Sequence, residues 1–280
     1  MSLSTTAFGL RLLLCVAFAS PVGYVAYISG VAIHELLGHG VTAWLLGGTF
    51  QGFALMPDGM GWAVSSAPKS ENIVLAGGVI VGMAFGLFLL PLAYRFTHPL
   101  ARMTCLLFAV CSFEDAAPYV FWNSVFPRPP GDFGRILLDL QSEWLRWSLV
   151  VGFGTAYIAT SVGCSIAVFR CFESLLGCLT KVQAIILAWV FFGLGGGIAW
   201  FGFDWNQLIQ DVGRLPQFAG AALQFAIAPI LVATRGKERP AISVSNRCWV
   251  VSITSAWFAA GLLVAVLLLW LQHGLFWNEE

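Results

Sequence analysis

The sequence predicts an all-α membrane protein, a polytopic helical bundle of about seven transmembrane helices. Of the 280 residues, 59% are hydrophobic and only 10% are charged. A soluble domain carries about 25% charged residues, and its core could not hold this much apolar surface. Apolar stretches of the roughly 20 residues that a helix needs to cross a bilayer follow one another from end to end. We therefore expect a single membrane domain over residues 1–280, surrounded by the lipid bilayer.

The first apolar stretch is the longest of the chain. Residues 1–20 look like a signal peptide, but Pro21 follows at once and disfavours cleavage, so we expect them to stay in the mature chain. The helix either bends at Pro21, or residues 8–20 form a separate piece. The predicted spans lie near residues 21–46, 72–96, 100–122, 147–170, 182–203, 217–234 and 248–272.

The distribution of lysine and arginine predicts an orientation. In the seven-span arrangement most of these residues fall on the side of the amino terminus, among them Arg95, Arg102 and Arg170. Positively charged loops stay in the cytoplasm, so the amino terminus is expected inside and the Glu279-Glu280 tail outside, in the cytoplasmic membrane of a cell. The formal net charge is zero and no basic tract is present, which argues against nucleic acid as a partner.

A polar cluster interrupts the first span. His34, Glu35 and His39 lie close together in otherwise apolar sequence. A charged residue at the bilayer centre costs about 2.5 to 3.5 kcal/mol on insertion scales, so such groups need pairing, water or a metal to compensate. Zinc suits these residue types, because neutral imidazoles bind the ion and a neighbouring glutamate takes a proton from water. The alternative is that the three groups only form hydrogen bonds to neighbouring helices.

The spacing of the two histidines is one residue longer than in the usual zinc-binding helix. HExxH places the histidines on one face, whereas this chain has HExxxH. On a regular α-helix the imidazoles of His34 and His39 would diverge by about 140°, too far to share an ion. A π-bulge would bring them together again, and Gly38 lies in the interval where we expect it.

A second informative segment, residues 123–137, is rich in proline. Pro127, Pro129 and Pro130 prevent a continuous helix, so we expect an extended loop that leads to Asp132 at the start of the next helix. The carboxylate of Asp132 could complete a set of two histidines and a carboxylate, with one position left open for water. Taken alone, an aspartate at this place is also typical of a helix cap or a surface charge.

Together these segments resemble the site-2 protease family of intramembrane zinc metalloproteases. That family has HExxH on one membrane helix and a later loop of the form P-x-P-P-L-D-G-G-R, to which residues 127–135 are similar. Ala76-Gly77-Gly78 is similar to the A-G-P that opens the following span in the family, with Gly78 in place of the proline. The resemblance covers roughly residues 21–140, which would form a metalloprotease-like core, and residues 141–280 would add further transmembrane helices.

The resemblance implies a site and an activity. His34, His39 and Asp132 would be the zinc ligands, and Glu35 would be the catalytic base. The substrate would be a transmembrane protein, hydrolysed within the bilayer. The segment HELLGH is also similar to the HExxGH motif of the soluble dipeptidyl peptidase III family, which shows that a zinc peptidase can use this histidine spacing.

Three polar residues in or just after the third predicted span are candidates to support the site. Glu114 and Asp115 could accept a hydrogen bond from a histidine N–H, and Glu114 could also be an alternative third ligand. Asn123, at the start of the proline-rich segment, is the third candidate. The other interpretation of Glu114 and Asp115 is a polar pair near the interface or along a hydrated cavity.

Two other classes of function stay open beside zinc-dependent proteolysis. The first is a non-catalytic membrane adaptor that keeps the protease fold, which zinc content without proteolysis would indicate. The second is a transporter that passes protons or metal ions along the buried histidines and glutamate, which ion flux in reconstituted vesicles would reveal. The match around Asp132 argues against the transporter, because transport has no evident need for it.

Overall fold

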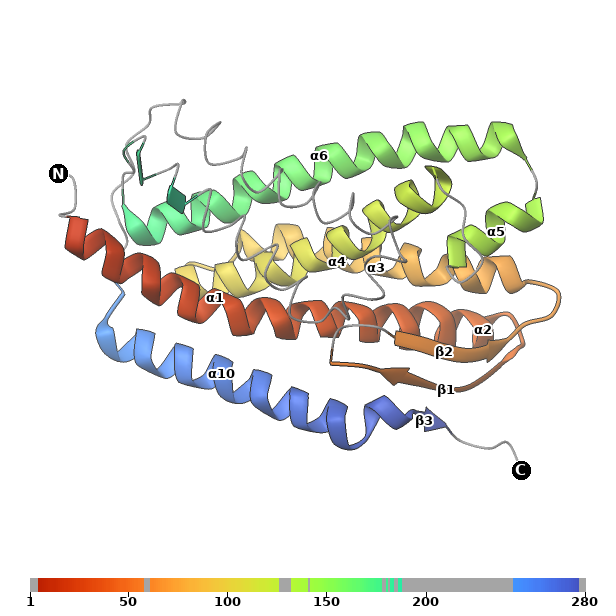
Figure 1. The fold of residues 1–280 in the computed structure, drawn as a ribbon, viewed down its shortest axis with the longest axis horizontal. Coiled ribbons are helices and arrows are strands. Elements are labelled where there is room, and N and C mark those ends of the chain that lie inside the picture. The colour runs from red at the N-terminus through yellow and green to blue at the C-terminus, as the bar shows by residue number, and fades with distance from the viewer. Residues whose placement is uncertain are drawn as a thin grey trace, which may run out of the picture.

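The computed structural model describes residues 5–57, 61–125, 132–140, 142–177, 180, 182–183, 186–187 and 244–276. Its long helices run side by side, with a small sheet at one end (Figure 1). They are α1 (Thr5–Ile33), α3 (Glu71–Ala93), α4 (Pro99–Val125), α6 (Glu143–Leu176) and α10 (Asn246–Leu269). This confirms an all-α membrane bundle. The spans expected at 182–203 and 217–234 lie outside the described residues, apart from two short pieces.

Four helical segments within the described residues are long and apolar enough to cross a membrane. They are Ala7–Leu45, Glu71–Ala93, Glu143–Leu176 and Asn246–Leu269, and a shorter apolar stretch, Pro99–Phe113, lies within α4. These helices account for the predicted spans near 21–46, 72–96, 100–122, 147–170 and 248–272. The chain is therefore an integral membrane protein.

The first span is one continuous helix. α1 leads directly into the π-helix η1 (His34–Val41) and then into α2 (Thr42–Leu45), so residues 8–20 are not a separate piece. Pro21 lies inside α1 and has no N–H to donate to the carbonyl of Ala17, four residues earlier. The indole N–H of Trp257, in α10, donates to that carbonyl instead, at 3.0 Å. Trp257 thus supplies the hydrogen bond to the Ala17 carbonyl that Pro21 cannot donate.

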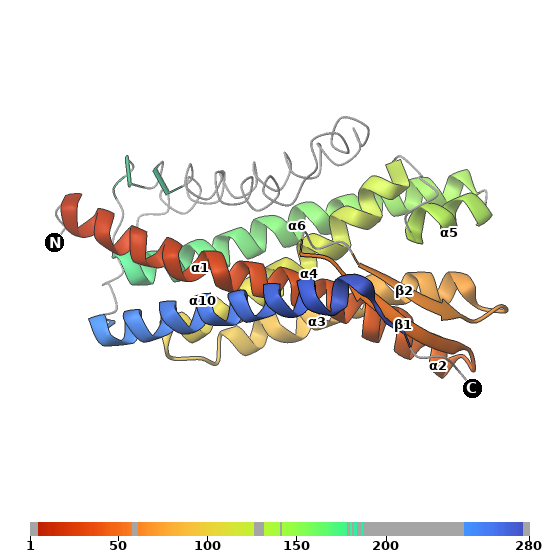
Figure 2. The same cartoon turned by 60° about the horizontal axis from the view of Figure 1, so that its bottom comes forward.

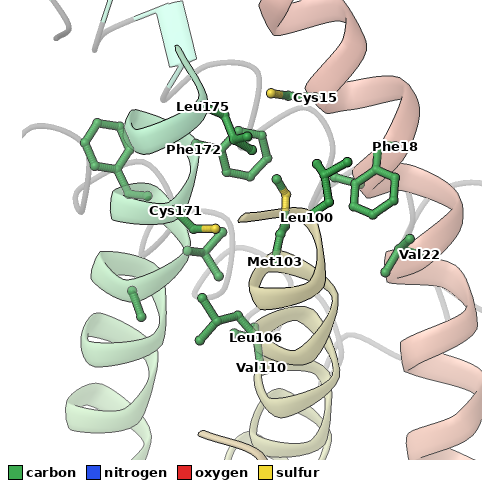
Figure 3. Close-up of a cluster of buried hydrophobic side chains, with 14 of the residues drawn as sticks. Cys15, Phe18, Val22, Leu100, Met103, Leu106, Val110, Cys171, Phe172 and Leu175 are labelled. Carbon is green, nitrogen blue, oxygen red and sulfur yellow. The ribbon is translucent and has the colours of Figure 1, made fainter. Parts of the chain in front are cut away.

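The core of the bundle is centred on α4, which packs against α1, α3 and α6. α10 lies along α1, as Figure 2 shows. At the end of the bundle remote from the sheet, side chains of three helices meet (Figure 3): Cys15, Phe18 and Val22 of α1, Leu100, Met103, Leu106 and Val110 of α4, and Cys171, Phe172 and Leu175 of α6. The free cysteines in this core behave as small buried hydrophobic residues.

A three-stranded antiparallel sheet lies beside α2 and the end of α10, and the sequence analysis did not predict it. β1 (Thr49–Leu55) and β2 (Gly61–Ser66) form a hairpin, and β3 (Leu275–Phe276) pairs with the other edge of β1. A short 3₁₀ turn, η2 (Leu271–His273), connects α10 to β3. Side chains of β2 alternate between partly buried and exposed. That period of two is a strand signal, but it is short beside the long apolar spans.

The short helix α5 (Asp132–Leu140) begins at Asp132, as the sequence predicted. Its apolar residues Phe133 and Ile136 pack against Val79 of α3 and Val120 of α4. This packing holds the start of α5 beside the first span. The proline-rich loop before it, residues 126–131, lies outside the described residues.

Candidate metal centre

The two histidines of HExxxH lie on a π-helix. η1 is a π-helix, the form in which backbone N–H groups bond to carbonyls five residues earlier, so His39 lies one turn above His34. The centroids of the two imidazole rings are 4.9 Å apart. The predicted π-bulge is confirmed, and it extends over eight residues, His34–Val41. The longer spacing therefore does not separate the two side chains.

Glycines allow η1 to lie directly against α3. A Cβ atom added to Gly38 would lie 2.8 Å from the backbone nitrogen of Gly78, and one added to Gly77 would lie 2.7 Å from Oγ1 of Thr42. Real Cβ atoms do not approach other atoms this closely, so the two backbones can meet only where side chains are absent. Gly77 and Gly78 thus permit a close contact between α3 and η1.

Four side chains from two segments, distant in sequence, converge at this contact. The Nε2 atoms of His34 and His39 lie 3.4 Å and 3.2 Å from the same carboxylate oxygen of Asp132. An oxygen of Glu35 lies 3.9 Å from Nε2 of His39. Only 6% of Glu35 and 5% of His39 are exposed to solvent, so these two residues are buried, whereas the side chains of His34 and Asp132 are partly exposed. These residues could hold a metal ion.

The orientation of His39 favours a cation in the centre of the cluster. Its Nδ1 lies 2.9 Å from the carbonyl oxygen of Val74, in α3. A carbonyl can only accept a hydrogen bond, so Nδ1 carries the proton, and a neutral ring then has a bare lone pair on Nε2. That lone pair faces the carboxylate of Asp132. Two acceptors at this distance attract each other only with a proton or a metal ion between them. Two imidazoles and a carboxylate are a donor set that suits a metal.

The ionisation of Asp132 agrees with this role. Burial by itself would raise the pKa of this carboxyl group, but when both Nε2 atoms carry a proton, hydrogen bonds from His34 and His39 and the positive charges of the two rings outweigh burial. The pKa of Asp132 is therefore lowered, and the group is a carboxylate at neutral pH. An anionic oxygen is the form that binds a metal cation.

Glu35 lies between the histidines and the hairpin. A Cβ atom added to Gly61, the first residue of β2, would lie 3.1 Å from Cγ of Glu35, so the backbone of the strand runs against this side chain. β2 is an edge of the sheet. The side chain of Glu35 thus has the cluster on one side and the face of the sheet at Gly61 on the other.

The three supporting residues expected from the sequence are not joined to the cluster by the described contacts. Glu114 and Asp115 belong to α4, but their side chains lie outside the described part of the structure. The amide of Asn123 donates to the carbonyl of Tyr119 in its own helix, at 2.8 Å, rather than supporting a histidine. The acceptor for the ring N–H of His39 is the backbone carbonyl of Val74.

Two groups at the site escaped the sequence analysis. The carbonyl of Val74 carries no residue-type signal, because every residue has one. Tyr119 touches both halves of the cluster: its hydroxyl accepts a hydrogen bond from the backbone N–H of Asp132 at 2.6 Å, and its ring stands edge-on to His34. Its position between Asp115 and Asn123, both of which the sequence analysis considered, is the one hint that the sequence offered.

Comparison with known families agrees with the geometry. Residues 7–118 match the model of the family described as Peptidase M50B-like. This stretch includes His34, Glu35, His39 and the glycines of α3, and ends before Asp132. The match confirms the resemblance to the site-2 protease family and indicates a membrane metallopeptidase of that type. Searches of curated proteins and of solved structures returned no match.

Proposed function

We propose that this chain is an intramembrane zinc metalloprotease that hydrolyses peptide bonds in transmembrane protein substrates. The observation that carries the proposal is the convergence of His34 and His39, inside a membrane helix, with Asp132 at the start of α5, and with Glu35 beside them. Buried ionisable residues in a membrane span are costly and mark functional sites. The match to the Peptidase M50B-like family supports a metallopeptidase as the function of this site.

Each residue has a chemical role in this proposal. His34, His39 and Asp132 hold the zinc ion, and the hydrogen bond to the Val74 carbonyl keeps the Nε2 atom of His39 directed toward it. A bound zinc ion acts as a Lewis acid on the substrate carbonyl and on water. Glu35 is the general base: it takes a proton from the attacking water and gives it to the leaving amine.

The hairpin offers a way to hold the substrate. Within the described residues β2 pairs only with β1, so its other edge has unpaired backbone N–H and C=O groups, and Gly61, the first residue of this strand, lies against Glu35. An extended peptide can add to such an edge through main-chain hydrogen bonds. A transmembrane substrate helix would have to unwind locally to do so, which exposes its peptide bonds to the site. We place the protein in the cytoplasmic membrane with its amino terminus in the cytoplasm.

Zinc content and proteolysis test the proposal together. Wild-type protein should contain about one zinc ion per chain, as a three-ligand site predicts. Replacing His34, His39 or Asp132 by alanine should remove it. His98→Ala is the matched control, because His98 is exposed and near Cys248, in another part of the bundle. Glu35→Gln should keep the zinc and stop the cleavage of tagged single-span membrane proteins expressed with the chain.

The outcomes separate the proposed functions. Cleavage by Glu35→Gln at the wild-type rate would refute the role of Glu35. Zinc in the wild type without cleavage of any tagged protein would favour the adaptor, in which the protease fold only binds transmembrane partners. A wild-type protein without zinc would remove the basis of the metalloprotease.

A further inference from the structure

Tyr119 connects the two segments that form the cluster. It lies in α4 and is partly buried. Its hydroxyl oxygen accepts a hydrogen bond of 2.6 Å from the backbone N–H of Asp132. Its ring meets the imidazole of His34 edge to face, with centroids 6.4 Å apart and ring planes at 89°. One side chain therefore contacts a residue of η1 and a residue of α5, which are far apart in the sequence.

The hydrogen bond acts at the place where α5 begins. The first backbone N–H groups of a helix have no partner inside the helix. For Asp132 the Tyr119 hydroxyl supplies that partner, so it fixes the backbone atoms from which the carboxylate extends. The ring of the same tyrosine limits the space in which the imidazole of His34 can rotate. Both effects bring the carboxylate of Asp132 and Nε2 of His34 toward each other.

Other contacts of α5 fix its position less closely. Phe133 and Ile136 place the helix on α3 and α4 through apolar packing, which tolerates small shifts along the surface. The ion pair between Arg135 and Glu71 is formed by half-exposed side chains. Such surface pairs contribute little to the stability of a structure. By contrast, the hydrogen bond to the Tyr119 hydroxyl is made by the backbone N–H of Asp132 itself.

We propose that Tyr119 is a positioning residue of the metal centre, whose hydroxyl holds the backbone of Asp132 and whose ring holds the imidazole of His34. The inference rests on the proposed function, because the groups that Tyr119 positions are the proposed metal ligands. Residues that orient metal ligands typically change metal affinity by about 10- to 100-fold when they are replaced.

Tyr119→Phe tests the proposal, since it removes one oxygen atom and keeps the ring. The full chain is purified in detergent and loaded with Co²⁺, whose visible absorption reports ligand geometry. We expect a changed spectrum and about 10- to 100-fold weaker binding of Zn²⁺ in competition with a chelator. Tyr157→Phe is the control, because Tyr157 is a buried tyrosine of α6 whose ring lies tilted beside that of Phe121 rather than beside a proposed ligand.

A second measurement uses wild-type protein and does not depend on the folding of a variant. In the zinc-loaded chain, the amide of Asp132 should exchange its hydrogen slowly, because it is bonded to the tyrosine hydroxyl. Rapid exchange of this amide, or a Tyr119→Phe protein with the wild-type spectrum and affinity, would overturn the proposal. If the wild-type chain binds neither Co²⁺ nor Zn²⁺, the proposed metalloprotease function itself is wrong.

Discussion

Glycine occupies position 78, where the A-G-P motif of the site-2 protease family has proline, and the structure gives a steric reason. A Cβ atom added to Gly78 would lie 2.6 Å from Cε1 of His34 and 2.7 Å from its Cδ2. The imidazole therefore occupies the space of a side chain at position 78. In this structure the ring of His34, the first residue of the π-helix, lies against α3 at a position that has no side chain.

This steric relation predicts the effect of Gly78→Ala. The added methyl group should displace the ring of His34 and weaken zinc binding by at least about 10-fold, the effect typical of disturbed ligand orientation. Chelator competition measures the affinity. Gly82→Ala, one turn further along α3, is the matched control, since its Cβ would make only an ordinary contact of 3.8 Å with Ala116. Equal affinities of the two variants would contradict the proposed position of His34.

At the scale of elements, the carboxyl-terminal strand joins the last long helix to the hairpin beside Glu35. β3 pairs with Gly52 and Phe53 of β1. Gly52 has φ of +148°, a conformation that side chains rarely adopt, and a Cβ there would lie 2.7 Å from Cα of Phe276. The hairpin, α1 and the end of α10 also share apolar contacts, in which Leu267 packs with Leu55 and Val31.

This pairing predicts that Gly52→Ala loosens the sheet and leaves the metal centre intact. Strain of about 1 to 3 kcal/mol is expected from the backbone conformation alone. Thermal unfolding in detergent should occur at lower temperature and cleavage should be slower, while the zinc content stays at the wild-type level. Gly261→Ala, in α10, is the control, because nothing lies within 4 Å of its added Cβ. Loss of zinc from Gly52→Ala would show that the sheet also supports the ligands.

At the scale of the whole molecule, the start of α1 and strand β3 lie at opposite ends of the bundle (Figure 1). The first two crossings are Ala7–Leu45 and Glu71–Ala93. The turn at Lys69, between the hairpin and α3, should therefore face the side opposite to the amino terminus. The segment at Arg95, between α3 and α4, should face the same side as the amino terminus.

With the amino terminus inside, a membrane-impermeant thiol reagent applied to intact cells should label Lys69→Cys and not Arg95→Cys. Both positions are exposed, so side-chain burial does not account for a difference between them. Labelling of the unsubstituted protein gives the background signal from its native cysteines. Labelling of Arg95→Cys alone would reverse the orientation that the lysine and arginine distribution predicts.

The sequence alone determined the membrane class, the helices at five of the predicted spans and the grouping of His34, Glu35 and His39 in the first of them, and the resemblance to the site-2 protease family added Asp132. Those features follow from local rules: apolar runs form spans, and rare polar residues inside them mark a site. It also indicated a π-bulge, because HExxxH on a regular helix would separate the imidazoles, and the structure extends this bulge to a π-helix of eight residues. The spans expected at 182–203 and 217–234 remain predictions.

Only the tertiary structure decided what surrounds these residues. The Val74 carbonyl, the contact of Gly78 with His34, the bond from Asp132 to Tyr119 and the strand beside Glu35 all join segments distant in the chain. Every residue has a backbone carbonyl, so the sequence does not show which carbonyl accepts a hydrogen bond. A glycine in the sequence shows that a close contact is possible, but it does not show which residue makes that contact. Such partners are set by how the helices pack, so they became visible only in the folded chain.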